Sequence, residues 1–150
     1  MKTLKTISFI SYALVGLLGF VFAFIYLFRS EFMPYHAVAV GSEWTTVDES
    51  MKILILALMR VSGGGWLATA ISITFLLIAR SKFTSSIFSI GMTLVGLGAL
   101  IPTLYATLFV RSNSPADPPW FAAVIGIALL VIALVLDSLA GFESDKKKSD

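Results

Sequence analysis

The chain has 150 residues, of which 57% are hydrophobic and only 13% are charged, and its net charge is +2. A soluble domain of this size needs far more charge to cover its surface, so the composition excludes a soluble globular protein and predicts that lipid surrounds most of the chain. The basic residues flank apolar runs instead of forming a patch, which argues against nucleic acid as a partner. The chain has no cysteine, which excludes disulfide exchange and thiolate metal sites.

Four apolar runs are each long enough to cross a bilayer core of about 30 Å. The predicted spans are residues 7–28, 53–79, 83–110 and 120–140. The first run also resembles a signal peptide, but it is longer than a secretory apolar core and is predicted to be retained as a helix. The predicted fold class is therefore all-α, an integral membrane four-helix bundle over residues 1–142. Residues 143–150 contain three consecutive lysines and are predicted to form a charged, disordered cytoplasmic tail.

Residues 29–52 form the one substantial polar loop, between the first and second spans. Pro34 followed by Gly41 predicts a short helix, because proline favours the first position of a helix and glycine the position after its end. Thr46 and Glu49 fit a capping box that would start the next long helix. The loop is therefore predicted to be partly helical.

The distribution of lysine and arginine predicts the orientation of the spans, because basic residues concentrate on the cytoplasmic side. One side of the membrane would carry Lys2, Lys5, Arg80, Lys82, Lys146, Lys147 and Lys148. The other side would carry Arg29, Lys52 and Arg111. The protein is therefore predicted to cross the inner membrane of a bacterial cell several times, with both termini in the cytoplasm (N-in, C-in) and the polar loop outside.

The segment Leu58–Trp66 places a charge, three consecutive glycines and a tryptophan inside the second span. Each glycine costs a helix about 1 kcal/mol relative to alanine. In a membrane this cost is usually offset by the close approach of a neighbouring helix. The residues predicted to pack helices together are Gly63, Gly64, Gly65, Ala68 and Pro102.

Arg60 is predicted to face the bundle interior in the outer third of the membrane. Pro102 lies at a matching depth and cannot donate a hydrogen bond to the preceding turn, which leaves a carbonyl acceptor free. Arg60 would bond this backbone, Thr103 or Tyr105, or a carboxylate of the loop, and would form the floor of an outward-facing polar pocket. The residues predicted to bind a ligand there are Arg60, Glu31, His36, Glu43, Trp44, Thr103 and Tyr105.

His36, the only histidine, lies among acidic residues of the loop, where it could bind a divalent metal, sense pH or bond its neighbours. These residues lack a recognised ligand spacing, so no metal site and no cofactor are predicted. Hydroxyl residues in the spans have no histidine or acid close in sequence to activate them, so no catalytic residue is predicted. Asp137 is expected to pair with Arg80, Lys82 or Lys5 rather than to relay protons.

Glu31–His36 and Leu58–Trp66 together resemble a group of small, uncharacterised four-span bacterial membrane proteins, and the general plan is similar to that of DoxX-like four-helix membrane proteins. The resemblance implies the fold and carries no established activity. The predicted function is that of a non-enzymatic membrane protein, either an accessory subunit or a small-molecule binder. A small oligomeric transporter and a membrane enzyme acting on a lipid-like substrate are the alternatives. Its predicted partners are the lipid bilayer and either a homo-oligomer or a larger membrane complex.

Overall fold

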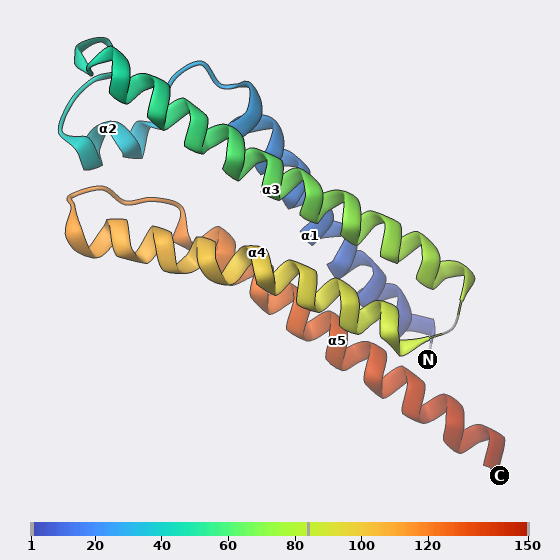
Figure 1. Cartoon of the computed structure of the whole chain (residues 1–150). Coiled ribbons are helices and arrows are strands. Elements are labelled where there is room, and N and C mark those ends of the chain that lie inside the picture. The colour runs from blue at the N-terminus through green and yellow to red at the C-terminus, as the bar shows by residue number, and fades with distance from the viewer. Residues whose placement is uncertain (1, 84, 150) are drawn as a thin grey trace.

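The computed structural model describes residues 2–83 and 85–149, and the side chains of residues 143–149 lie outside this description. The helices in chain order are α1 (Lys2–Phe28), α2 (Pro34–Val40), the short 3-10 helix η1 (Trp44–Thr46), α3 (Glu49–Lys82), α4 (Ser86–Asn113) and α5 (Trp120–Ser149) (Figure 1). The described residues contain no strand, which confirms the predicted all-α class. Four helices are long and apolar enough to cross a membrane, so this is a multi-pass membrane protein.

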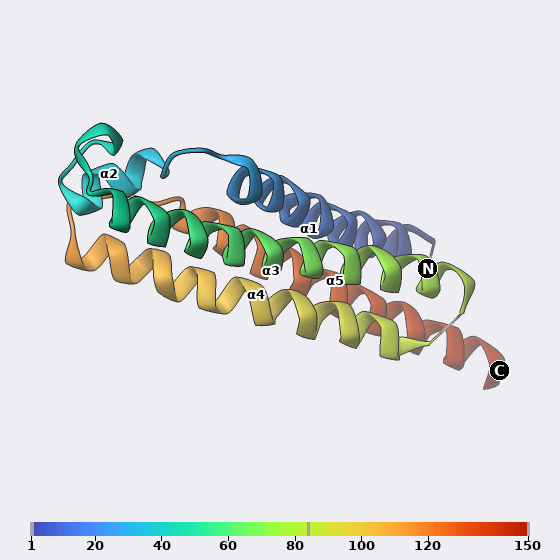
Figure 2. The ribbon, with the colours of Figure 1, turned by 45° about the horizontal axis from the view of Figure 1, so that its top comes forward.

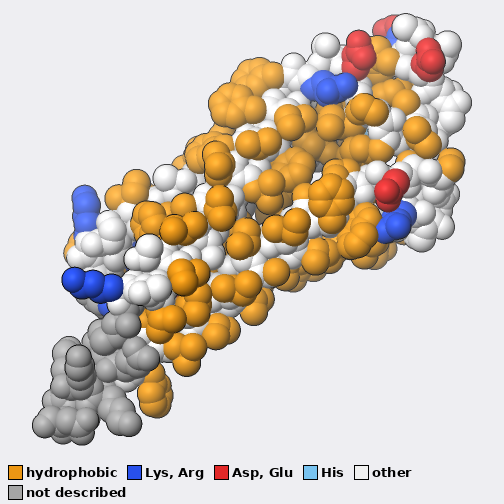
Figure 3. Space-filling view, turned by 180° about the vertical axis from the view of Figure 1, so that it is seen from behind, with side chains coloured by type: hydrophobic (Ala, Val, Ile, Leu, Met, Phe, Trp, Pro, Cys, Tyr) orange, Lys and Arg blue, Asp and Glu red, His pale blue; other side chains and the backbone are white. Residues whose placement is uncertain are grey.

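The four long helices form a ring in which α1 and α4 each pack against both α3 and α5. Their outer surfaces are apolar, and Figure 3 shows a broad band of hydrophobic side chains with charged side chains at both ends of the molecule. Both ends of the chain lie at the same end of the ring (Figure 1). Helix α5 runs to Ser149 and includes most of the predicted tail, whose side chains lie outside the described residues. That tail and the cytoplasmic location of the termini stay predictions.

Helices α1 and α3 cross so closely at Gly63 that this position has no room for a side chain. A Cβ added to Gly63 would lie 2.8 Å from Leu27 Cγ and 2.9 Å from the backbone nitrogen of Leu27. Gly64 and Gly65 are exposed, and a Cβ on either would meet no other side chain or helix within 4 Å. All three were predicted to pack helices together, but successive helical residues turn by about 100°, which points the second and third away from α1.

The contact between α4 and α5 is built from two reciprocal pairs of glycine and leucine. Gly126 of α5 lies against Leu100 of α4, whose methyl groups would be 2.9 Å from an added Cβ, and Gly96 of α4 lies in the same way against Leu130 of α5. Both leucines are almost fully buried. Each leucine therefore fills the space that the glycine of the opposite helix leaves, which gives the close packing that membrane helices require.

A polar cluster joins all four long helices near the end where the termini lie. Arg80 of α3 forms a salt bridge with Asp137 of α5, and Ser89 of α4 donates a hydrogen bond to the second oxygen of the same carboxylate. From α1, the Tyr12 hydroxyl lies 3.1 Å from the Ser89 carbonyl oxygen and 3.0 Å from the Thr93 hydroxyl. The expected pairing of Asp137 with Arg80 is confirmed. We call these five residues the four-helix clasp.

The opposite end of the ring is uneven, because α3 continues past the end of α1. Gly63 lies level with Leu27, so the preceding part of α3, residues 49–62, extends about 21 Å beyond this level. Phe32 of the loop packs against this extension in a second, smaller apolar cluster with Val47 and Met59. Figures 1 and 2 show α2 beside the ends of α3 and α4, beyond the end of α1.

The loop between α1 and α3 is partly helical, as predicted. Pro34 is the first residue of α2, and Gly41, in the left-handed conformation with a φ of +70°, ends it. Helix α3 begins after Asp48, whose side-chain oxygen accepts a hydrogen bond from the backbone nitrogen of Ser50. The predicted capping box is wrong, because Thr46 lies in η1 and its hydroxyl donates to a carbonyl within that turn.

Candidate functional site

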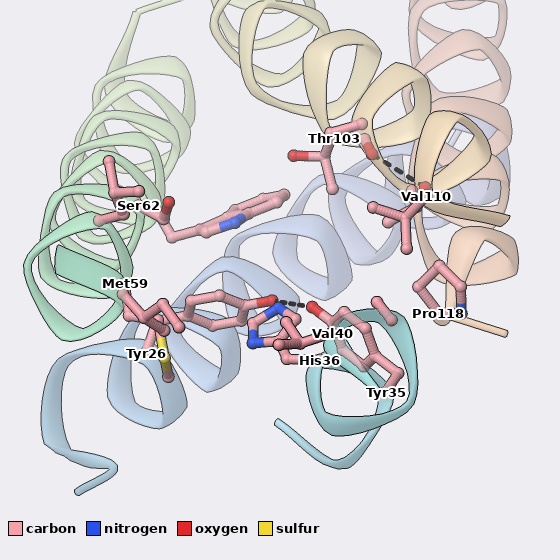
Figure 4. A pocket seen from close by; sticks show the side chains of 15 residues that line it. Tyr26, Tyr35, His36, Val40, Met59, Ser62, Thr103, Val110 and Pro118 are labelled. Carbon is pink, nitrogen blue, oxygen red and sulfur yellow. Dashed lines mark hydrogen bonds between the residues drawn. The ribbon is translucent and has the colours of Figure 1, made fainter. Parts of the chain in front are cut away.

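A cavity of about 400 Å³ lies at the uneven end of the ring, between α3 and α4 and beside α2 (Figure 4). Most of its lining is apolar, and α1, α2, α3, α4 and the connection before α5 all contribute to it. None of the residues that line it is a lysine, arginine, aspartate or glutamate. The cavity exists because α3 and α4 extend beyond the end of α1, and the short helix α2 fills only part of the space that α1 leaves.

The cavity opens toward the outer surface of the bundle between α3 and α4. Leu58 and Ser62 of α3 and Ala106 of α4 line the cavity and are also exposed on the surface, which marks its mouth. Leu58 is 58% exposed. Both helices are apolar enough to span a membrane. The mouth therefore lies between two helices that are long and apolar enough to cross a membrane.

Two tyrosine hydroxyls lie at the α2 side of the cavity. Tyr26, from the end of α1, and Tyr35, from α2, place their hydroxyl oxygens 2.6 Å apart (Figure 4). One hydroxyl donates its proton to the other, so the pair retains one proton that it can donate to a bound molecule. Burial, and then the hydrogen bond with Tyr26, raise the pKa of Tyr35 above its ordinary value. The Tyr35 phenol therefore stays protonated.

His36 is a second donor at the same side of the cavity (Figure 4). Its Nδ1 accepts a hydrogen bond of 3.2 Å from the backbone nitrogen of Met33, the residue that precedes α2. Burial, and then the positive charge of Arg29, lower the pKa of His36, which favours the neutral ring. A neutral imidazole that accepts at Nδ1 carries its proton on Nε2. His36 therefore offers an N–H group in addition to the tyrosine proton.

The threonines of α4 that line the cavity have no free hydroxyl proton. Thr103 donates to the carbonyl oxygen of Ala99 at 2.8 Å, and Thr107 donates to the carbonyl oxygen of Thr103 at 2.9 Å. Such bonds to the preceding turn are the usual way in which a membrane helix satisfies a hydroxyl. The other donors of the lining are the tyrosine pair and His36 at α2, the Ser62 hydroxyl at the mouth and the indole N–H of Trp66 on α3.

Apart from Arg60, the predicted ligand-binding residues lie in three separate places. His36 and Thr103 line the cavity. Another depression of about 290 Å³ is lined in part by Glu31, Glu43 and Trp44. Tyr105 is 71% exposed on the outside of α4.

Arg60 supports the end of α1 and does not line the cavity. Its guanidinium donates to the carbonyl oxygens of Tyr26 and Arg29, each at 2.7 Å. The last carbonyls of a helix lack partners within the helix and form the negative end of its dipole, so a cation is well placed there. This corrects the expected bonds to the backbone near Pro102, to α4 side chains or to a loop carboxylate. Pro102 and Ala68, predicted to pack helices, are both exposed.

Sequence reasoning did not find Tyr26 and Tyr35 as a pair. Tyr26 ends a span and Tyr35 lies in the loop, and no periodic pattern links such positions. Arg60 is connected to this pair, because it bonds the backbone of Tyr26 while the Tyr26 side chain reaches the cavity. Arg60 is therefore a positioning residue for the cavity wall.

Comparison of the chain with protein-family models, with curated proteins and with solved structures finds no match. The resemblance to DoxX-like proteins therefore stays a prediction. Within residues 2–83 and 85–142, no group of three or more acidic or histidine side chains is placed to hold a metal ion. The fold and the site together define a four-helix membrane protein with a largely apolar cavity that opens between two of its membrane-spanning helices.

Acidification is expected to loosen α2. Because the folded protein lowers the pKa of His36, the neutral ring contributes stability that is fully present above the ordinary pKa of about 6.5. This contribution is lost as the pH falls through the lowered pKa. A proton added at Nδ1 would also point at the Met33 N–H and break the cap. Amide hydrogen exchange, corrected for the intrinsic effect of pH, should show that α2 is less protected at pH 5 than at pH 7.5.

His36→Gln is the matched control for this pH effect. Glutamine at this position can accept the same backbone hydrogen bond in a capping box, and it does not titrate. The protection of α2 in this variant should be the same at both pH values. Equal pH dependence in the variant and in the unsubstituted protein would assign the effect to another group.

Proposed function

We propose that this protein is a non-enzymatic membrane protein that binds a lipophilic small molecule in the cavity between α3 and α4. The observation that carries the proposal is an apolar cavity of about 400 Å³ whose mouth lies between two membrane-spanning helices. Ligand sites in proteins are commonly of about this size or larger, and are mostly apolar with a few polar groups. A molecule dissolved in the bilayer would enter through this mouth without crossing water.

The chemistry of the lining supports binding over catalysis. The hydroxyls of Thr103 and Thr107 donate to their own helix, and the lining residues include no carboxylate that would activate a nucleophile. The distribution of lysine and arginine supports an orientation with both termini in the cytoplasm of a cell whose inner membrane holds the protein. The mouth would then take its ligand from the outer leaflet.

The intrinsic fluorescence of Trp66 tests this proposal, because Trp66 lines the cavity and the other two tryptophans do not. The double substitution Trp44→Phe and Trp120→Phe leaves Trp66 as the single fluorophore. Bromine quenches tryptophan at close range, so an alkane brominated at one end reports its arrival in the cavity. We expect saturable quenching of the purified protein in detergent.

Two alanine-to-phenylalanine substitutions test the route of entry. One would block the mouth of the cavity, and the other is a matched control on the surface. Ala106→Phe would fill the mouth between α3 and α4, and we expect it to weaken binding of the bromoalkane at least about tenfold, since the added ring would occupy space that the ligand needs. Ala128→Phe adds the same ring on the exposed surface of α5, away from the cavity, and should leave binding unchanged. Equal quenching in both variants would show that the probe reaches Trp66 from the micelle without entering the cavity, and the proposal would fail.

A further inference from the structure

We infer that the bound molecule is an uncharged lipophile that presents a carbonyl oxygen to the hydroxyl pair of Tyr26 and Tyr35 and to His36. This inference rests on the proposed binding function and names the ligand's chemical class. It is carried by the polar groups at the α2 side of the cavity, by their protonation and by their position within a largely apolar lining.

The polar end of the cavity offers donors. The two tyrosine hydroxyls share one hydrogen bond at 2.6 Å, which leaves one hydroxyl proton free. His36 accepts at Nδ1 from the backbone, so its remaining proton is on Nε2, which has no hydrogen-bond partner among the described residues. Both groups come from the same side of the cavity (Figure 4). A carbonyl oxygen has two lone pairs and can accept from both.

The cavity disfavours a charged ligand. A carboxylate or phosphate would need a cation, but no lysine or arginine lines the cavity, and the nearby Arg60 donates to two carbonyl oxygens at the end of α1. An ammonium group would need a carboxylate, which the lining also lacks. Because an unpaired ion is costly to bury, the polar end of the ligand is uncharged.

The apolar part of the cavity determines how the hydrocarbon part of the bound ligand is oriented. Met59 and Trp66 both line it from α3, and they lie seven residues, or about 10 Å, apart along the helix. Met59 belongs to the smaller apolar cluster, against which Tyr26 packs, and Trp66 belongs to the main core of the bundle. A ligand whose carbonyl meets the tyrosines would therefore extend its hydrocarbon part toward Trp66.

Two kinds of membrane molecule share this chemistry. The acyl ester of a glycerolipid and the ring of a quinone each present an uncharged carbonyl oxygen on a lipophilic body. Tyrosine and histidine N–H or O–H groups would recognise the oxygen in either one. The experiment below separates these sources by competition.

The test compares two probes of equal chain length, a bromoalkane and a bromoketone that carries its carbonyl at the end away from the bromine. On the protein with Trp66 as its single tryptophan, the ketone should quench with an affinity about three- to tenfold higher than the alkane, the gain expected of one or two hydrogen bonds. Tyr26→Phe with Tyr35→Phe removes the hydroxyl pair, and it should lower the ratio of the ketone affinity to the alkane affinity measured on the same variant. Tyr35→Phe alone is the milder control, because the Tyr26 hydroxyl then keeps its own proton.

The possible outcomes separate this inference from the proposed function. If both probes saturate with equal affinity, the carbonyl inference is overturned and the binding function stands. If neither saturates, the binding function itself fails. An unchanged ketone preference in the double variant would also overturn the inference. The two probes can be compared on protein with both tyrosines, so the test does not depend on the double variant folding.

Competition against the bound bromoketone then shows whether the carbonyl of the natural ligand belongs to a lipid ester or to a quinone. A fatty acid methyl ester and an alkyl benzoquinone represent the two carbonyl sources, and at least one of them should displace the probe. The matching fatty acid at pH 8, where it is ionised, should displace it at least about tenfold less well, because the cavity would have to bury an unpaired charge. Displacement by the anion alone would contradict the inference.

Discussion

Replacing Asp137 by alanine is expected to destabilise the folded bundle by about 3–5 kcal/mol, the usual cost of leaving one partner of a buried ion pair alone. The side chains of Arg80 and Asp137 are only 15% and 11% exposed. The substitution would leave the guanidinium without its carboxylate and the Ser89 hydroxyl without its acceptor. Because the four-helix clasp connects all four long helices, the whole bundle should respond. Unfolding in mixed micelles, followed by circular dichroism against the fraction of denaturing detergent, would measure the loss.

Two further variants distinguish the loss of the buried Arg80–Asp137 ion pair from a general effect of removing a charge on stability. Arg111 and Asp117 form an exposed ion pair at 3.3 Å, and Arg111→Gln should change stability by less than about 1 kcal/mol. Replacing Arg80 by methionine together with Asp137 by leucine removes both charges, and it should recover much of the stability that Asp137→Ala loses. If Asp137→Ala costs no more than Arg111→Gln, the clasp does not stabilise the bundle.

Adding one methyl group at Gly63 is expected to destabilise the bundle by about 1–3 kcal/mol, in addition to any change in helix propensity. The new Cβ would lie 2.9 Å from the backbone nitrogen of Leu27 and 3.1 Å from the carbonyl carbon of Tyr26. Backbone atoms cannot rotate out of the way, so the end of α1 must move. That movement would also shift the Tyr26 hydroxyl at the cavity wall. Gly63→Ala should therefore weaken both folding and quenching of Trp66 by the bromoalkane.

Gly64→Ala, one residue further along, is the matched control. A Cβ there meets nothing within 4 Å, so the substitution should stabilise α3 by up to about 1 kcal/mol through helix propensity. The two variants add the same group to the same helix, but Gly63→Ala should lower the stability of the bundle and Gly64→Ala should raise it. Equal stability of the two would mean that α1 and α3 are not in close contact at Gly63.

The helices could be predicted from the sequence because each is specified by residues within its own segment. Each of the four spans is a long apolar run, and the ends of α2 were predicted from Pro34 and Gly41 alone. The start of α3 was less well predicted, since Thr46, Asp48 and Glu49 each favour a helix start. In the structure Asp48 is the cap and Thr46 lies in the preceding 3-10 helix.

The site could not be predicted in the same way, because it depends on where one helix ends beside another. Arg60 was assigned to a polar pocket since a charge inside a span usually faces a cavity. The sequence does not show that α1 ends level with Arg60, which places two free carbonyl oxygens beside its guanidinium. The same unequal helix ends create the cavity and bring Tyr26 to Tyr35, nine residues away in the chain.

The packing of α1 against α5 has a consequence for biogenesis. These are the first and last helices of the chain, so the ring closes only after the final segment has been synthesised and inserted. A nascent chain that has completed only its first three spans has Arg80 without the Asp137 carboxylate that pairs with it in the folded bundle. The last helix therefore both closes the ring of helices and supplies the carboxylate that neutralises Arg80.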